Sequence, residues 1–100
     1  MSIITGGLSE LKVADEEVQN LINQVRDELE SKVGKRFTIY EAVSFKTQVV
    51  SGANYLIKIK IEVDIYIHVR LFCPLSQADA APKLVKYQLN KSKDDEIVFF

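Results

Sequence analysis

The sequence has little of the chemistry on which enzymes and metal sites depend. It contains one histidine, His68, and one cysteine, Cys73. A lone cysteine cannot form an internal disulfide, and one His with one Cys cannot complete a tetrahedral zinc site without two suitably placed carboxylates. In a regular strand, residues five apart point to opposite faces of the sheet, so His68 could not activate Cys73 as a nucleophile. The sequence therefore predicts that the protein is not an enzyme and has no metal site or cofactor.

Other absences exclude further classes of protein. The 13 basic and 14 acidic residues are nearly balanced and form no basic run, so no nucleic-acid partner is expected. No apolar run approaches the roughly 20 residues of a membrane-spanning helix, and the first residues lack the basic start and apolar stretch of a signal peptide. Together with the single cysteine, these features favour a cytoplasmic protein with no membrane partner.

The composition is that of a small globular protein. With 47% of its 100 residues hydrophobic, the chain is large enough for one core and too small for two. No repeat or Pro/Gly-rich linker divides it, so residues 1–100 are interpreted as a single domain. Both prolines, Pro74 and Pro82, fall in segment 74–82, which predicts one long irregular connection. The acidic run at 94–96 is interpreted as a solvated end.

Segment 15–33 predicts one amphipathic helix. Its apolar residues recur at the spacing of a single helical stripe: Val18, Leu21, Ile22, Val25, Leu29 and Val33. Asp15 is expected to cap the N-terminus of this helix, and Gly34 is expected to adopt the left-handed conformation that commonly follows a helix end.

After Gly34 the apolar residues recur at every second position, which predicts strands around residues 37–45, 55–61, 65–71 and 85–89. The first should bend or bulge near Glu41, and the last should present Val85, Tyr87 and Leu89 on one face. His68 is expected on the sheet surface, and the residues before the helix should add an edge strand. Because only the helix has a long apolar stripe, the fold class is α+β, with an antiparallel meander wrapped around one helix.

The stretch Gln48-Val49-Val50-Ser51-Gly52, between the first two strands, is unusual for a hairpin loop. Hairpin turns usually contain polar residues or glycines that tolerate positive φ, whereas this one carries two β-branched valines. Either Val49 and Val50 merely extend the strands, or they form an exposed apolar contact for a partner.

This stretch resembles the QVVAG loop of the cystatins, with Ser51 in place of alanine. Further resemblance is found in Gly6-Gly7-Leu8-Ser9-Glu10, segment 41–50, Asn54-Tyr55, segment 68–72 and Tyr87-Gln88. The resemblance covers essentially the whole chain and points to the stefins, the intracellular cystatins without disulfides. It implies a cystatin-like fold, a five-stranded antiparallel β-sheet wrapped around one α-helix. It also implies reversible, tight-binding inhibition of papain-like cysteine proteases such as cathepsins.

In that family an N-terminal trunk and two hairpin loops form a wedge that occludes the active-site cleft of the protease. The resemblance therefore implies the following protease-binding residues: Ile4, Thr5 and Gly6 in the trunk, Gln48, Val49, Val50, Ser51 and Gly52 in the first loop, and Leu75 and Ser76 in the second. Ser76 stands where the family often has proline, and residues 61–65 lack the glycine that usually turns the next two strands. The alternative is accordingly a cystatin-fold interaction module, natural or engineered as a binding scaffold, with weakened inhibition.

The resemblance also implies a monomer that can form a domain-swapped dimer. The expected route is the opening of the first loop into one continuous strand. A β-branched residue held in a tight turn is a candidate for backbone strain, which such opening would relieve.

Overall fold

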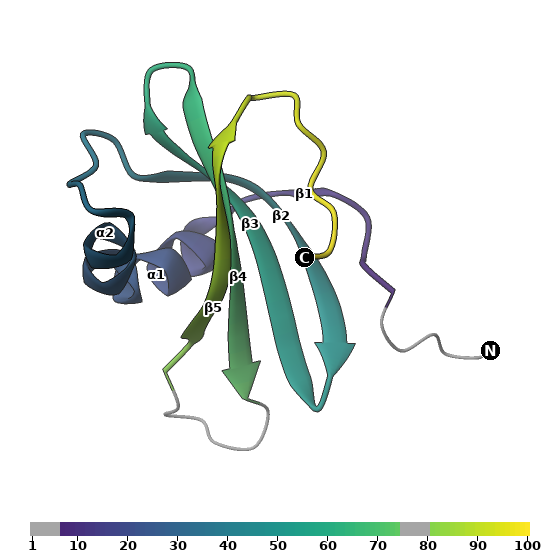
Figure 1. Ribbon diagram of the computed structural model, residues 1–100. Helices are drawn as coiled ribbons and strands as arrows, with labels where there is room; N and C mark the ends of the chain where they lie inside the picture. The colour runs from purple at the N-terminus through teal and green to yellow at the C-terminus, as the bar shows by residue number, and fades with distance from the viewer. Residues whose placement is uncertain (1–6, 75–80) are drawn as a thin grey trace.

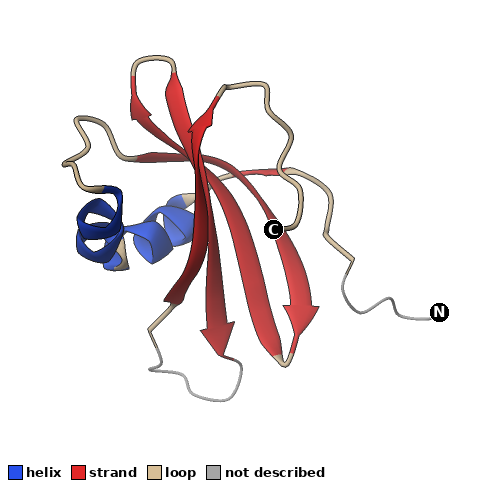
Figure 2. Ribbon diagram, in the orientation of Figure 1, coloured by secondary structure: helices blue, strands red, loops and turns tan. Residues whose placement is uncertain are grey.

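The computed structural model describes residues 7–74 and 81–100, which form a five-stranded antiparallel sheet with two helical segments against one face (Figures 1 and 2). The helical segments are α1 (Glu16–Gln24) and α2 (Arg26–Val33). Neighbouring strands are consecutive in the chain: β1 (Lys12–Val13), β2 (Glu41–Val50), β3 (Gly52–Glu62), β4 (Ile65–Pro74) and β5 (Lys83–Lys91). The predicted α+β class, the meander and the edge strand before the helix are confirmed. Neither described helical segment has the length and apolarity needed to cross a bilayer.

The helix predicted over segment 15–33 is divided into two at Val25, so the prediction of one continuous helix was wrong. Val25 has φ −109° and ψ 9°, outside the helical range, and α1 and α2 run in different directions on either side of it (Figure 1). The side chain of Val25 remains buried, so the apolar stripe continues across the break. Both predicted caps are confirmed: the Asp15 carboxylate accepts a hydrogen bond from the Val18 N–H at 3.0 Å, and Gly34 has φ 88°.

The core lies between the helical stripe and the inner face of the sheet. Its side chains come from α1, the break, α2, the connection after α2 and alternate positions of the central strands. The buried members are Val18, Ile22, Val25, Leu29, Phe37, Phe45, Ile57, Ile59, Ile61, Ile67, Val69 and Leu71.

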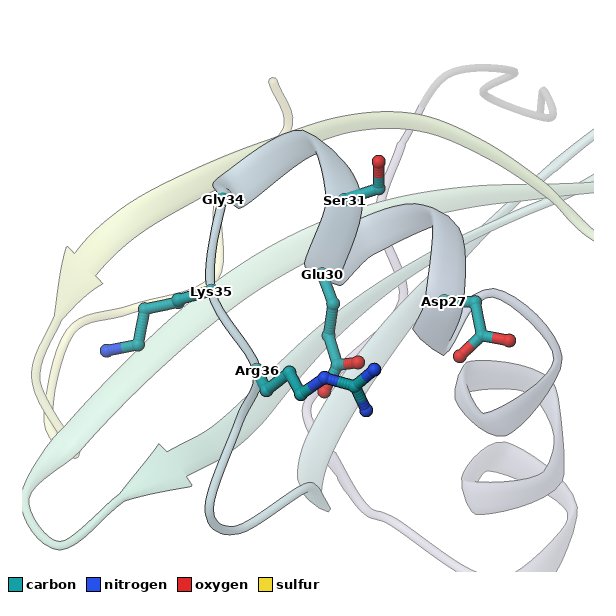
Figure 3. A pocket seen from close by; sticks show the side chains of 6 residues that line it. All are labelled: Asp27, Glu30, Ser31, Gly34, Lys35 and Arg36. Atoms are coloured by element: carbon teal, nitrogen blue, oxygen red, sulfur yellow. The ribbon is translucent and has the colours of Figure 1, made fainter.

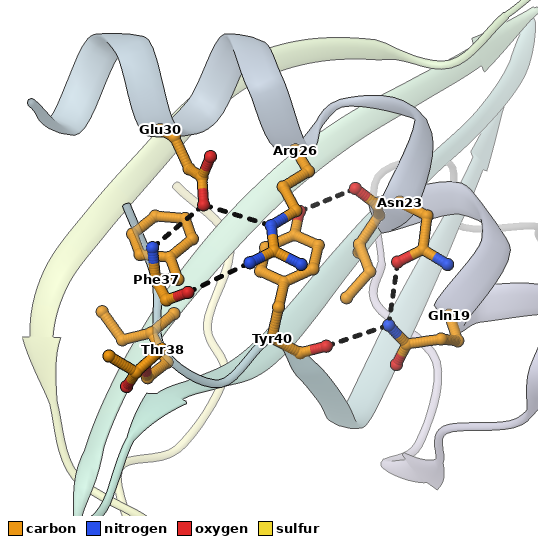
Figure 4. Close-up of polar contacts among 9 residues, drawn as sticks. Gln19, Asn23, Arg26, Glu30, Phe37, Thr38 and Tyr40 are labelled. Carbon is orange, nitrogen blue, oxygen red and sulfur yellow. Dashed lines mark hydrogen bonds and ion pairs between the residues drawn. The ribbon is translucent and has the colours of Figure 1, made fainter. Parts of the chain in front are cut away.

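The connection between α2 and β2 is held by helix side chains (Figure 4). The Glu30 carboxylate accepts a hydrogen bond from the Phe37 N–H at 2.9 Å and pairs with Arg26 at 3.1 Å; Arg26 in turn donates to the Phe37 carbonyl at 3.0 Å. The hydrogen bond from Phe37 is the main cause that lowers the pKa of Glu30. The strand predicted from residue 37 therefore begins only at Glu41, because the backbone of Phe37 is bonded to the helix instead of to another strand.

Two bulges interrupt the central strands. In β2 the pairing shifts by one residue between Ala42 and Ser44, close to the bend expected near Glu41. In β3 it shifts between Lys60 and Glu62, next to a tight turn in which Asp64 has φ 61°. The irregularity expected in segment 61–65 is thus confirmed.

The last strand departs from the predicted alternation. Its pairing with β4 shifts twice, between Arg70 and Leu71 at Val85 and between Tyr66 and His68 near Leu89. Leu84 and Tyr87 pack against the core, while Val85 and Leu89 are exposed. The expectation that Val85, Tyr87 and Leu89 share one face was wrong, because each extra residue in β5 interrupts the alternation of its side chains.

The C-terminal segment 92–100 crosses the outer face of the sheet, opposite the helices (Figure 1). Lys46 Nζ, on β2, donates to the carbonyl of Ile97 at 2.8 Å. The Arg70 guanidinium, on β4, lies 4.9 Å from the centroid of the Phe99 ring. Ile97, within this segment, is buried, so the outer face has a small core of its own. The acidic run at 94–96 is exposed, as predicted.

His68 lies buried on this outer face, and the prediction that it is a surface residue was wrong. Its side chain is 0% exposed, and neither ring nitrogen has a hydrogen-bond partner among the described residues. Burial, then the charges of Lys58 and Lys91, lower the pKa of His68 to about 4, against a smaller opposing effect of Asp95. Strand alternation placed His68 outward correctly but could not show that the C-terminal segment would cover it.

The buried imidazole should make the stability of the protein depend on pH. An unfolded chain binds a proton at His68 near pH 6.5, whereas the folded chain does so only near pH 4. Between these values the unfolded state binds more protons, so the free energy of unfolding should fall as the pH falls, by at most about 1.4 kcal/mol per pH unit. Urea unfolding of the wild type and of His68→Gln from pH 7 to 4 measures this. The free energy of unfolding should depend less on pH in the variant than in the wild type. An equal dependence in the two proteins would show that His68 is not the group responsible.

Candidate functional site

The β2–β3 hairpin ends in a very short turn. Val50 pairs with Gly52, so Ser51 is the only residue between the two strands. The side chain of Val49 is 73% exposed and that of Val50 is 37% exposed. The two interpretations of the valines therefore hold together: Val49 and Val50 extend β2, and they form an exposed apolar tip.

The backbone strain expected at the valines is not found. Among the described residues, positive φ occurs at Gly34, Gly52, Asp64 and Asn90, whereas Val49 and Val50 have regular strand pairing. The unusual conformation of the hairpin belongs to Gly52, with φ 128°, which glycine adopts without a steric penalty. The domain-swapped dimer stays a prediction, without strain at the valines as its physical cause.

Gly52 also lies tightly against β4. A Cβ atom at this position would be 2.6 Å from the carbonyl oxygen of Cys73 and 2.9 Å from Cζ of Phe72. Glycine is therefore required at residue 52 both for its φ and for the close approach of the two backbones. This approach fixes the hairpin tip beside the end of β4.

The end of β4 lies beside the hairpin tip, and the described N-terminal segment runs along β2 just before the tip (Figure 1). The Ser9 N–H donates to the Thr47 carbonyl at 2.8 Å, and the Thr47 N–H donates to Ser9 Oγ at 2.9 Å. On the other side of the hairpin, Gly52 faces Pro74 across the β3–β4 pair. The hairpin is thus flanked by two segments that are distant from it in sequence.

Half of the predicted protease-binding residues are in the described part of the chain. Of the five hairpin residues, Val49, Val50, Ser51 and Gly52 form the tip, and Gln48 lies directly behind it. The others, Ile4, Thr5, Gly6, Leu75 and Ser76, lie outside the described residues.

Two polar side chains are buried directly behind the tip. Gln48 and Asn54 face each other across β2 and β3 and are each 7% exposed. Asn54 Nδ2 donates to Gln48 Oε1 at 2.6 Å. The sequence analysis did not identify Asn54 as a partner of Gln48. The spacing could have indicated it, because both residues lie at the same distance from Ser51, and a hairpin centred on Ser51 places them opposite each other.

Cys73 lies at the end of β4, next to the hairpin, as predicted for a residue near a strand end. It pairs with Ala53, whereas His68 pairs with Lys58 and Gln88 further along the sheet. Burial, followed by the charge of Glu17, raises the pKa of the Cys73 thiol, which favours the neutral, weakly nucleophilic form.

One hollow of the described surface lies far from the tip. It has a volume of about 430 Å³, is at the C-terminal end of α2 (Figure 3) and is lined by Asp27, Glu30, Ser31, Gly34, Lys35 and Arg36. The connection after α2 leads to the opposite end of β3, where the Ile39 N–H bonds to the Ile61 carbonyl. The lining contains no His or Cys, and Glu30 already accepts the Phe37 N–H. No cluster of three metal-ligating side chains occurs in residues 7–74 and 81–100.

The requirement for Gly52 can be measured against Gly34, which also has positive φ but where an added Cβ would meet no described atom within 4 Å. Gly52→Ala should lower the free energy of unfolding by more than Gly34→Ala, because it adds a backbone collision to the conformational cost of about 1–2 kcal/mol that both share. Urea unfolding of the two variants gives the comparison. Equal losses would show that the contact of Gly52 with β4 is not a constraint.

Comparison with known proteins agrees with the fold. Residues 6–94 match the cystatin domain family. Cystatin-A of Felis catus is 43% identical over 98 residues, covering 98% of this chain and 100% of the relative. Stefin-C of Bos taurus is 40% identical, covering 95% and 94%, and leukocyte cysteine proteinase inhibitor 1 of Sus scrofa is 39% identical, covering 98% and 95%. The chain therefore belongs to the cystatin family and is of the stefin type.

Proposed function

We propose that this protein is a reversible, tight-binding inhibitor of papain-like cysteine proteases. The observation that carries the proposal is the exposed Val49-Val50 tip, in a hairpin flanked by the N-terminal segment and the end of β4. Family membership supports it, since the Sus scrofa relative is itself named as a cysteine proteinase inhibitor. The unpaired Cys73 fits a reducing, cytoplasmic location.

Inhibition proceeds by occlusion. The valines offer rigid apolar contact and lose little side-chain entropy on binding, while the close approach of Gly52 to β4 keeps the tip narrow. In the trunk, Ile4 and Thr5 occupy substrate subsites. Gly6 lets the chain turn away from the catalytic thiolate, so that no carbonyl is presented for attack. Leu75 and Ser76 add the second loop to the same wedge.

The first test uses papain and two exposed valines, one in β2 at the hairpin tip and one in the turn after β3. Val49 and Val63 are 73% and 72% exposed, and Val63 lies in the β3–β4 turn, far from the tip. Val49→Asp should weaken inhibition by roughly 10- to 100-fold, because it removes an apolar contact and forces a charge into the interface. Val63→Asp should leave inhibition unchanged. Titration of papain of known active concentration measures both.

Two results of this titration would contradict the proposal. A wild-type chain that fails to inhibit papain would overturn the inhibitory function and favour a cystatin-fold interaction module. Equal weakening by Val49→Asp and Val63→Asp would show that the hairpin tip is not the contact.

The second test removes the trunk. A chain that begins at Gly7 keeps both hydrogen bonds between Ser9 and Thr47 and should melt at the same temperature as the full chain. Its complex with papain should dissociate roughly 10- to 100-fold faster, since one buried Ile side chain contributes about 1.5–3 kcal/mol. The association rate should change little. Surface-binding kinetics measure both rates, and unchanged dissociation would exclude the trunk from the interface.

A further inference from the structure

We propose that Asn54 is a positioning residue of the inhibitory hairpin, which acts through its buried hydrogen bond to Gln48. The proposal rests on the inhibitory function proposed above. It assigns a role in binding to a residue behind the interface, whose side chain is nearly inaccessible to a protease.

The pair lies directly behind the tip and joins the two strands that carry it. Gln48 and Asn54 face each other across β2 and β3, and only the short stretch from Val49 to Ala53 lies beyond them. Strand ends open more readily than strand centres, so the direction of the valines depends on whatever fixes the strands immediately behind them. The 2.6 Å hydrogen bond joins the two strands at that level.

The low exposure of the pair makes this hydrogen bond costly to break. Both side chains are 7% exposed, and a buried amide left without its partner costs about 1–3 kcal/mol. The strands therefore cannot twist or slip at this level without that cost. An exposed pair of amides would exchange its partner for water and would hold nothing in place.

Phe72 extends the support to a third strand. Asn54 faces Phe72 across the β3–β4 pair, and the ring of Phe72 lies under Gly52, 2.9 Å from where a Cβ would stand. Gln48, Asn54 and Phe72 thus form a row across the outer face of the sheet. The row holds the base of the turn from one side and leaves the apolar tip free to contact the protease.

A positioning role differs from a general contribution to stability, and kinetics can separate the two. Asn54→Ala should accelerate dissociation from papain by about tenfold, since losing the fixed tip conformation acts mainly on the off-rate. Ile61→Val, in the core at the other end of β3, serves as the matched control. It should lower stability to a similar extent without changing dissociation.

The exchanged pair tests the hydrogen bond itself. Gln48→Asn combined with Asn54→Gln keeps one carboxamide on each strand and the same number of methylene groups. It should restore dissociation to within about threefold of the wild type. The double variant Gln48→Ala with Asn54→Ala should dissociate from papain no faster than the faster of the two single variants, because the effects of two residues that act through one contact are not additive.

The outcomes are distinguishable from a failure of the proposed function. If the wild type does not inhibit papain, the function itself fails. If the wild type inhibits and Asn54→Ala dissociates at the wild-type rate, or if Ile61→Val accelerates dissociation as much, the positioning role is overturned. If the exchanged pair dissociates from papain as fast as Asn54→Ala, the hydrogen bond is not the basis of the positioning role. Should Asn54→Ala not fold, Asn54→Leu removes the donor while filling the volume, and the same expectations apply.

Discussion

The register of the β2–β3 pair is the constraint on which the rest of the structure depends. Pairing of Val50 with Gly52 sets Phe45 opposite Ile57 in the core and Gln48 opposite Asn54 on the outer face. A slip by one residue would reverse every side chain between the two faces. It would bury charged side chains under the helices and expose the core. Gly52 secures this register at the turn, because only glycine fits against the backbone of β4 there.

The two faces of the sheet are covered in different ways. The inner face carries the apolar core under α1 and α2, whereas the outer face holds polar and charged side chains under the C-terminal segment. Lys46 reaches the carbonyl of Ile97, and Arg70 stacks on Phe99. An apolar layer supplies most of the stability of such a domain. The outer layer adds directional contacts between the sheet and the C-terminal segment.

The proposed occlusion requires an accurate shape at the hairpin and no reactive group there. In the structure the single histidine and the single cysteine lie apart. The hairpin is flanked by two segments that are distant from it in sequence: Ser9 bonds to Thr47, and Gly52 faces Pro74. The apolar tip is small, and its exposure in the free protein is tolerable because the flanking strands are well paired. Rigidity of the tip before binding reduces the entropy lost on association.

The sequence by itself determined the local elements and the family. The helical stripe, the Asp15 and Gly34 caps, the alternating strands and the valine-bearing hairpin all follow from short-range patterns, and so they could be predicted. Only the tertiary structure decided the break at Val25, the start of β2 at Glu41, the facing of Val85 and Leu89, the burial of His68 and the pairing of Asn54 with Gln48. Each of these depends on contacts with another segment: helix side chains take the backbone bonds of Phe37, two shifts interrupt the pairing of β5 with β4, and the C-terminal segment covers His68. Periodicity reports which face a side chain occupies, but contacts across the sheet decide what covers that face.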